Sequence, residues 1–434
     1  MHAQDGIQAL VFTGLGSLQK TRVVWLRDLQ LRWLRAVLPE LAYGRGRFDP
    51  AVQLLLTASG ARQLGASDEE VTALGREFAH GMTHPPSRLR LGDRGAHDPM
   101  GFRWTDAEHE GALLLYGNEG GVLDALSEQL TQGVSVSRSA EVYLPPSGRE
   151  PFGFLDGITR VHIARPDQSR PDAIPAGAFV FGHSDHTGAV PDGGPLGHNG
   201  SLVILRELAQ DVRAFWDYFL AQADGKEREA ILLAAKAIGR WPNGMPLLPG
   251  QTEEPPFDQD ALDFASFAHD RTGSGCPFGS HVRRANPRDG LVDSSTLSQQ
   301  ISAQHTLLRR GRLFGPPAPS DWYPGPLREA MPVAGDATSV AARGLFFVAL
   351  CTDIRRQFEF VTQNWLMAPK FAGLYNEVDP LLAHADTSRE FSIQTDSFCR
   401  HLEGVGGWVR PRGGGYYLLP GRGALERLLS RAGE

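Results

Sequence analysis

Three short segments of the 434-residue chain combine side chains that could move protons, hold a metal ion or stabilise negative charge. The first segment, residues 153–160, reads GFLDGITR and places Asp156 directly before Gly157. An aspartate in this position is typical of a tight turn, where its carboxylate caps nearby amides. The same turn can also direct the carboxylate into a pocket, where it would accept a proton. Asp156 is therefore a candidate base.

The second and third segments are rich in arginine. Residues 276–288 read CPFGSHVRRANPR, with His281 between a glycine-containing approach and several arginines. Imidazole is the commonest metal ligand among side chains, and arginines suit anionic groups such as propionates or phosphates. Residues 307–315 read LLRRGRLFG. These arginines could be solvated at the end of a strand, or one of them could turn inward beside a reactive anion.

Taken together and in this order, the three segments resemble motifs of the dye-decolorizing peroxidases. GFLDG resembles the GxxDG motif of that family, CPFGSHVRRANPR its proximal-histidine segment, and LLRRGRLFG the segment that supplies its distal arginine. Other stretches that resemble the longer members are HNGS at 198–201, GRWPNG at 239–244, RQFEF at 356–360 and RGGGYY at 412–417. The resemblance covers most of the chain, although the N-terminal part matches no specific motif.

The resemblance implies one non-covalently bound haem b per chain, with His281 as the metal ligand through a ring nitrogen. The other ring nitrogen should donate to a carboxylate or a carbonyl, and Asp353 and Asp396 are both candidates for that partner. Arginines near the motifs would pair with the haem propionates. The expected cofactor-binding residues are His281, Arg283, Arg284, Arg160 and Gly157.

On the opposite haem face, the resemblance implies that Asp156 and Arg309 are the catalytic residues. In hydrogen peroxide, one proton must pass from the inner to the outer oxygen so that the O–O bond breaks and water leaves. Asp156 would carry this proton, and the permanently charged Arg309 would stabilise the negative charge that develops. The family motif often continues Ile-Ser-Gln-Pro, whereas this chain has ITRV at 158–161, so Arg160 could also alter peroxide access.

The resemblance thus implies a haem peroxidase that reduces hydrogen peroxide and oxidises bulky aromatic donors such as dyes. The predicted pH optimum is acidic, because aspartate has an ordinary pKa of about 3.9 and stays ionised at lower pH than histidine, at about 6.5. Two alternatives on the same scaffold are a haem carrier without turnover and a protein that removes iron from haem. Asp156 and Arg309 together favour the enzyme, because a carrier needs the iron ligand alone.

The elements that position these residues show an internal pairing. Residues 24–29 (VWLRDL) resemble residues 203–208 (VILREL), and both precede a helical pattern. Residues 111–116 (GALLLY) and 344–350 (GLFFVAL) form a second such pair. Matching strand–helix units predict two related α+β halves. The resemblance makes them ferredoxin-like, each an antiparallel sheet with helices packed on it, as in the dimeric α+β barrel superfamily.

The expected division follows the Gly- and Pro-rich stretch before residue 200. An N-terminal domain, 1–197, carries the GxxDG loop at its end, and a C-terminal domain, 198–434, carries the haem ligand. The helices should run over residues 31–38, 121–130, 212–220 and 355–366.

Composition and local sequence patterns argue against several other classes of protein. The net charge of −7 without a long basic run argues against a large nucleic-acid surface. The longest clear apolar run, 345–351, is far shorter than the roughly 20 residues of a membrane span. The N-terminus lacks a secretory pattern, so a cytoplasmic location is expected. Three cysteines without a CxxCH motif predict neither a disulfide framework nor covalent haem attachment. Both a monomer and a homo-oligomer are compatible with the sequence.

Overall fold

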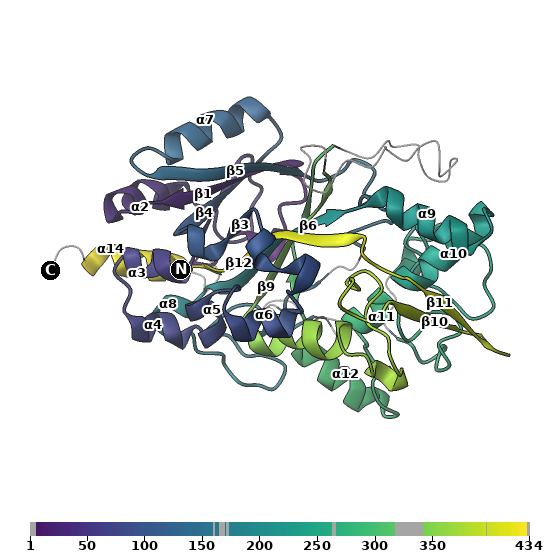
Figure 1. Ribbon diagram of the computed structural model, residues 1–434. Helices are drawn as coiled ribbons and strands as arrows, with labels where there is room; N and C mark the ends of the chain where they lie inside the picture. The colour runs from purple at the N-terminus through teal and green to yellow at the C-terminus, as the bar shows by residue number, and fades with distance from the viewer. Residues whose placement is uncertain are drawn as a thin grey trace.

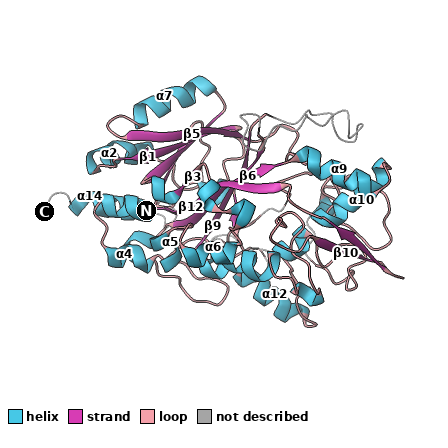
Figure 2. Ribbon diagram, viewed as in Figure 1, coloured by secondary structure: helices cyan, strands magenta, loops and turns pink. Residues whose placement is uncertain are grey.

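A computed structural model describes residues 6–158, 161–164, 170, 173–262, 266–316, 342–395 and 397–431. Its centre is an antiparallel sheet with the strand order β2-β4-β1-β5-β8-β9-β6-β12. Strand β12 also pairs with β2, through Leu418 and Leu56, so the sheet closes into a barrel. Helices cover the outside of this barrel (Figure 1, Figure 2).

Each half of the chain contributes four of these strands. The first half supplies β1 (Lys20–Arg27), β2 (Ala51–Leu56), β4 (Gly111–Gly117) and β5 (Ser135–Tyr143), and the second supplies β6 (Ser201–Gln210), β8 (Arg312–Phe314), β9 (Gly344–Cys351) and β12 (Val409–Leu419). In both halves, the first and third strands are central and the second and fourth are outer. This shared order confirms the predicted α+β fold with two ferredoxin-like sheets. The boundary between residues 197 and 198 stays a prediction.

The paired sequence segments form corresponding strands. The two VxLRxL-like segments lie in β1 and β6, the first strands of the halves, and GALLLY and GLFFVAL lie in β4 and β9, the third strands. These strands are apolar almost throughout because most of their side chains are buried, in the barrel interior on one side and against helices on the other. Trp25, Leu205 and Tyr417 belong to the interior core.

Helices α2 (Leu31–Val37), α7 (Gly120–Leu130) and α9 (Val212–Gln222) lie where helical patterns are predicted. The fourth predicted helix is instead two π-helical segments, η7 (Arg355–Glu359) and η8 (Val361–Leu366). The other helices are α1 (Leu10–Thr13), α3 (Ala58–Gln63), α4 (Asp68–Ala73), α5 (Arg76–His80), α6 (Pro85–Leu91), α8 (Gly194–Gly197), α10 (Glu227–Ile238), α11 (His281–Ala285), α12 (Ser295–Gln304) and α14 (Arg422–Ser430), and the other strands are β3 (Trp104–Thr105), β7 (Leu308–Arg309), β10 (Glu390–Gln394) and β11 (Cys399–Glu403).

A separate apolar core beside the barrel supports the candidate site. It contains residues of α9 and α10 together with Phe152 and Phe154, which lie just before Asp156. The indole N–H of Trp216 in α9 donates to the carbonyl of Phe152 at 3.1 Å. This core therefore fixes the start of the GFLDG loop. Within the described part of the chain, every helix is too short or too polar to cross a lipid bilayer.

Candidate active site

Asp156 lies on a turn whose backbone is held on both sides. The N–H of Leu155 donates to the carbonyl of Pro242, and the N–H of Asp156 donates to the carbonyl of Gly148, both at 2.8 Å. One carboxylate oxygen of Asp156 accepts the N–H of Gly157 at 2.7 Å, and the side chain remains exposed. Gly157 has a positive φ of 70°, which favours glycine here. The turn thus presents a fixed and accessible carboxylate.

The carboxylate of Glu150 anchors the base of this loop. The oxygens of Glu150 accept the N–H groups of Phe152 at 3.0 Å and Phe154 at 2.9 Å, and the side-chain amide of Gln210 at 2.7 Å. Burial raises the pKa of Glu150 to about 7. Glu150 is not recognisable as an anchor from the sequence, because its three donors come from the loop itself and from the distant strand β6.

His281 is the first residue of α11, and a buried carboxylate orients its ring. Nδ1 of His281 lies 2.8 Å from Oδ2 of Asp379. Because an ionised carboxylate only accepts, Nδ1 carries the proton and Nε2 keeps a lone pair. The His281 side chain is 30% exposed, whereas that of Asp379 is fully buried. A histidine backed by a carboxylate in this way is the usual arrangement of a metal-binding imidazole.

Arg309 lies on β7, which pairs with β9 so that Arg309 is opposite Ala349. Leu308 belongs to the barrel interior, and side chains alternate along a strand, so Arg309 points to the outer face. Its guanidinium is exposed and has no hydrogen bond or ion pair with any described residue. Leu345 and Phe347 of β9 share this face and are only half-buried. The unpaired guanidinium of Arg309 and the half-buried side chains of Leu345 and Phe347 thus lie on the same side of the sheet.

The turn at residues 239–244 lies between the Asp156 loop and α11. A Cβ at Gly244 would lie 2.6 Å from Cδ1 of Ile158, and a Cβ at Gly239 would lie 2.9 Å from Cβ of Val282. Both glycines also have positive φ, so other residues would be strained. The turn therefore packs closely against Ile158 and Val282, which lie close to the candidate base and the candidate metal ligand in the sequence.

No family model matches the chain. The chain is 28% identical over 276 residues to the dye-decolorizing peroxidase AauDyP1 of Auricularia auricula-judae, across 59% of this chain and 52% of that protein. It is 28% identical over 347 residues to a dye-decolorizing peroxidase of Exidia glandulosa, across 74% of this chain and 65% of that protein. These alignments span between about half and two-thirds of the curated relatives.

Solved structures agree over nearly the full chain. A dye-decolorizing peroxidase in complex with 2,6-dimethoxyphenol aligns with a TM-score of 0.81 and 22% identity, across 99% of this chain and all of that one. The chain therefore shares its fold with dye-decolorizing peroxidases and is similar to curated ones at 28% sequence identity. A DyP-type peroxidase of Anabaena sp. also aligns, with a TM-score of 0.79 and 18% identity, across 98% of this chain and 94% of that one.

The carboxylate that pairs with His281 is Asp379, which was not among the expected partners. Asp353 accepts the N–H of Arg356 at 2.8 Å and forms an ion pair with its guanidinium, so Asp353 is wrong as the partner. Asp396 lies outside the described residues. Asp379 was missed because it lies 98 residues from His281, and no local pattern links the two.

The expectation that Arg283 and Arg284 bind propionates is also corrected. Arg283 forms an ion pair with Asp270 at 3.1 Å and donates to a carbonyl, and it is 2% exposed. Arg284 is fully buried and donates to the carbonyls of Trp365 and Glu377, at 2.6 and 2.7 Å. Both guanidiniums fix α11 and are not available to a cofactor. Arg160, the third predicted arginine, lies outside the described residues.

The three arginines of the LLRRGRLFG segment have different roles. Arg310 donates to the carbonyls of Leu10 and Val11, at 3.0 and 2.8 Å. Arg312 donates to the carbonyls of residues 18 and 15, at 2.5 and 2.9 Å. These two arginines tie the N-terminal segment to the barrel. Among the three, Arg309 alone is left without such a contact in the described part of the chain.

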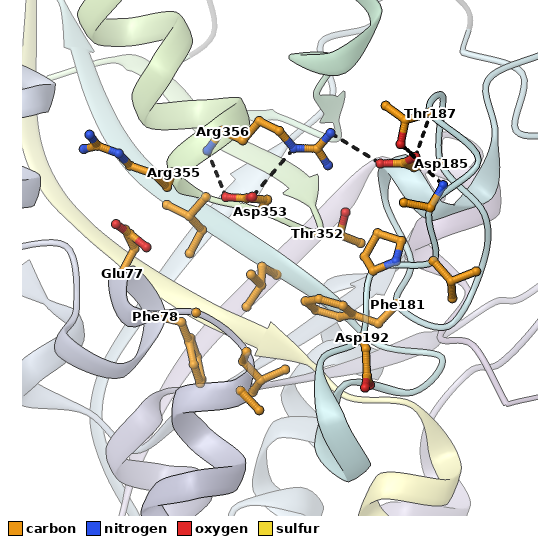
Figure 3. A pocket seen from close by; sticks show the side chains of 18 residues that line it. Glu77, Phe78, Phe181, Asp185, Thr187, Asp192, Thr352, Asp353, Arg355 and Arg356 are labelled. Carbon is orange, nitrogen blue, oxygen red and sulfur yellow. Dashed lines mark hydrogen bonds and ion pairs between the residues drawn. The ribbon is translucent and has the colours of Figure 1, made fainter.

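The structure also contains a cavity of about 580 Å³ between α4, α5 and the start of η7 (Figure 3). Phe78 and Phe181 contribute apolar walls, and Arg356 lies between Asp185 and Asp353, with which it forms ion pairs. Asp156, His281 and Arg309 do not line it. This cavity is therefore separate from the candidate active site.

Proposed function

We propose that the chain is a haem-dependent peroxidase that reduces hydrogen peroxide and oxidises aromatic donors. The observation that carries this proposal is the His281–Asp379 pair, which leaves one imidazole nitrogen free to bind a metal. The curated relatives are named peroxidases, and one solved relative holds 2,6-dimethoxyphenol, which supports an aromatic donor.

The residues fit one non-covalently bound haem b. His281 would hold the iron through Nε2, and Asp379 would make the imidazole more electron-donating. Leu345 and Phe347 offer a half-buried apolar face of the kind that a flat macrocycle would cover. When bound, the haem supplies the redox chemistry that transfers two electrons to peroxide and then recovers them one at a time from donors.

The chain itself would manage protons and charge. Asp156 would accept a proton from one oxygen of hydrogen peroxide and deliver it to the other, so that the O–O bond breaks and a molecule of water leaves. Arg309 would stabilise the negative charge that develops on the oxygens, since its own charge is unpaired among the described residues.

Reconstitution with haem tests this function. The purified protein, supplied with haem, should give a Soret band that shifts on addition of one equivalent of hydrogen peroxide, and it should then bleach an anthraquinone dye. A Soret band that peroxide leaves unchanged would instead indicate a carrier. Release of iron-free porphyrin without peroxide would indicate a haem-processing protein. Either of these outcomes overturns the proposal.

Dye oxidation should have an acidic optimum. Aspartate accepts protons effectively at lower pH than histidine does, so a carboxylate at position 156 extends activity below neutrality. The steady-state rate should therefore peak below pH 7 in a pH–rate profile. A peak at or above neutrality would show that Asp156 is not the base that limits the rate.

Replacing Asp379 with asparagine should raise the reduction potential of the bound haem. The substitution keeps the shape of the side chain and removes the negative charge behind Nδ1 of His281, so the imidazole becomes a weaker electron donor. A spectroelectrochemical titration measures the potential. Asp353→Asn is the matched control and should leave it unchanged, because Asp353 pairs with Arg356. Equal potentials in Asp379→Asn and the parent would contradict the positioning role.

A further inference from the structure

A second cavity, of about 410 Å³, lies beside α9 and the loop that precedes β12. Tyr218 and Trp408 form an aromatic wall, with ring centroids 5.3 Å apart. The hydroxyl of Tyr218 is occupied, because it donates to the carbonyl of Glu403 at 2.8 Å. Asp156, His281 and Arg309 do not line this cavity either. It is a separate place where an aromatic ring could pack.

The charges around this cavity favour an anion. Arg389 donates to the carbonyls of residues 404, 405 and 406, which hold its guanidinium without neutralising it. Arg410 is exposed and has no hydrogen bond or ion pair with any described residue. Asp211 is the one carboxylate among the described residues that line the cavity, and it caps α9 by accepting the N–H of Ala214 at 2.9 Å. The cavity is thus lined by two arginines and by one aspartate that already accepts a hydrogen bond.

A buried histidine adds an unused hydrogen-bond acceptor. His97 lines the cavity, is 6% exposed, and packs against the ring of His384 at a centroid distance of 4.3 Å. Its Nε2 has no partner among the described residues, so its ring hydrogen bond to the carbonyl of Val409 comes from Nδ1. Burial, with further repulsion from His384 and nearby arginines, lowers the pKa of His97 to about 3. The ring is therefore neutral, and its Nε2 can accept a hydrogen bond from an O–H or N–H donor.

The larger cavity lacks this combination. Its Arg356 is paired with two carboxylates, and Glu77 and Asp192 add further negative charge to its lining (Figure 3). An anion entering it would meet more carboxylates than guanidiniums, whereas the smaller cavity offers the opposite balance.

We propose that the cavity at Tyr218, Trp408 and Arg410 binds a hydroxylated aromatic carboxylate. The ring packs against Tyr218 and Trp408, the carboxylate pairs with Arg410 and Arg389, and the hydroxyl donates to Nε2 of His97. Such a ligand belongs to the same chemical class as the proposed aromatic donors, but the inference rests on this cavity alone and not on peroxidase activity.

Isothermal titration calorimetry of the purified protein tests the site with three related probes. 4-Hydroxybenzoate should bind one per chain. Benzoate, which lacks the hydroxyl, and 4-hydroxybenzyl alcohol, which lacks the charge, should each bind about tenfold more weakly or worse. Haem-free and haem-loaded protein should give the same affinity, which separates this site from one at His281 and keeps the test independent of any peroxidase result.

Two variants assign the binding to the cavity. Arg410→Ala, at an exposed position, should weaken the binding of 4-hydroxybenzoate about tenfold and leave the binding of 4-hydroxybenzyl alcohol unchanged. His97→Phe should remove the preference for 4-hydroxybenzoate over benzoate, and if this buried variant does not fold, Arg410→Ala still decides. Arg355→Ala, in the larger cavity, is the matched control and should leave the affinity for all three probes unchanged. Failure of the parent to bind 4-hydroxybenzoate, or equal binding by Arg410→Ala, would overturn the proposal.

Discussion

Replacing Arg309 with leucine is expected to slow the reaction with hydrogen peroxide by about 10²–10³-fold while haem remains bound. Leucine keeps much of the apolar stem and removes the charge. The loss should be large because Arg309 shares the outer face of β7 and β9 with the half-buried Leu345 and Phe347, and a haem covering this face would exclude water from around the charge. Stopped-flow measurement of the second-order rate constant, followed at the Soret band, checks it.

Two further variants make this result specific. Asp156→Asn should slow the same step by about 10²–10⁴-fold, because an amide cannot carry the proton. Arg355→Leu removes a half-exposed arginine whose nearest carboxylate, Glu359, is 3.9 Å away, and should react at the parent rate. If Arg309→Leu and Asp156→Asn both react as fast as the parent, the roles proposed for the two residues are wrong.

The second large effect is expected at His281, where substitution by alanine should abolish stable haem binding and reduce dye oxidation to background. Asp379 positions this imidazole, and the described part of α11 offers no other metal-binding side chain. The ratio of haem to protein after gel filtration measures the loss. Added imidazole should restore part of the Soret band, since it can occupy the space of the missing ring.

A histidine outside the site provides the control for this experiment. His80, which is exposed on α5 and stacks on His84, can be replaced with alanine without touching the proposed centre, so haem content should stay at one per chain. Stoichiometric haem and full activity in His281→Ala would remove the central assumption of the proposed function.

Much of the fold is predictable because its strands are locally distinctive. GALLLY is buried on both faces and GLFFVAL is apolar throughout, so both segments can be identified as strands without any knowledge of their partners. The partners themselves could not be predicted, because the pairing of Leu56 with Leu418 depends on sheet closure across most of the chain. The π-helical winding of residues 355–366 was likewise hidden, since their apolar spacing resembles that of an ordinary helix.

Only those residues of the site that lie in recognisable motifs could be predicted from the sequence. Asp156, His281 and Arg309 lie in recognisable segments, and the structure gives each a side chain that is at least partly exposed. Asp379 carries no motif, and its role follows from a long-range contact. The prediction for Arg284 failed for a different reason. In the sequence it is a cation near the metal ligand, and only the fold shows that its guanidinium already donates to buried carbonyls.

The closure of the barrel has a consequence for biosynthesis. Strand β2 emerges from the ribosome long before β12, so the edge of β2 that meets Leu418 stays unprotected while the intervening chain is made. Open strand edges recruit other chains, and contacts between distant residues form slowly. A polypeptide released before β12 would expose the edges of both β2 and β6 and should be a substrate for chaperones and proteases.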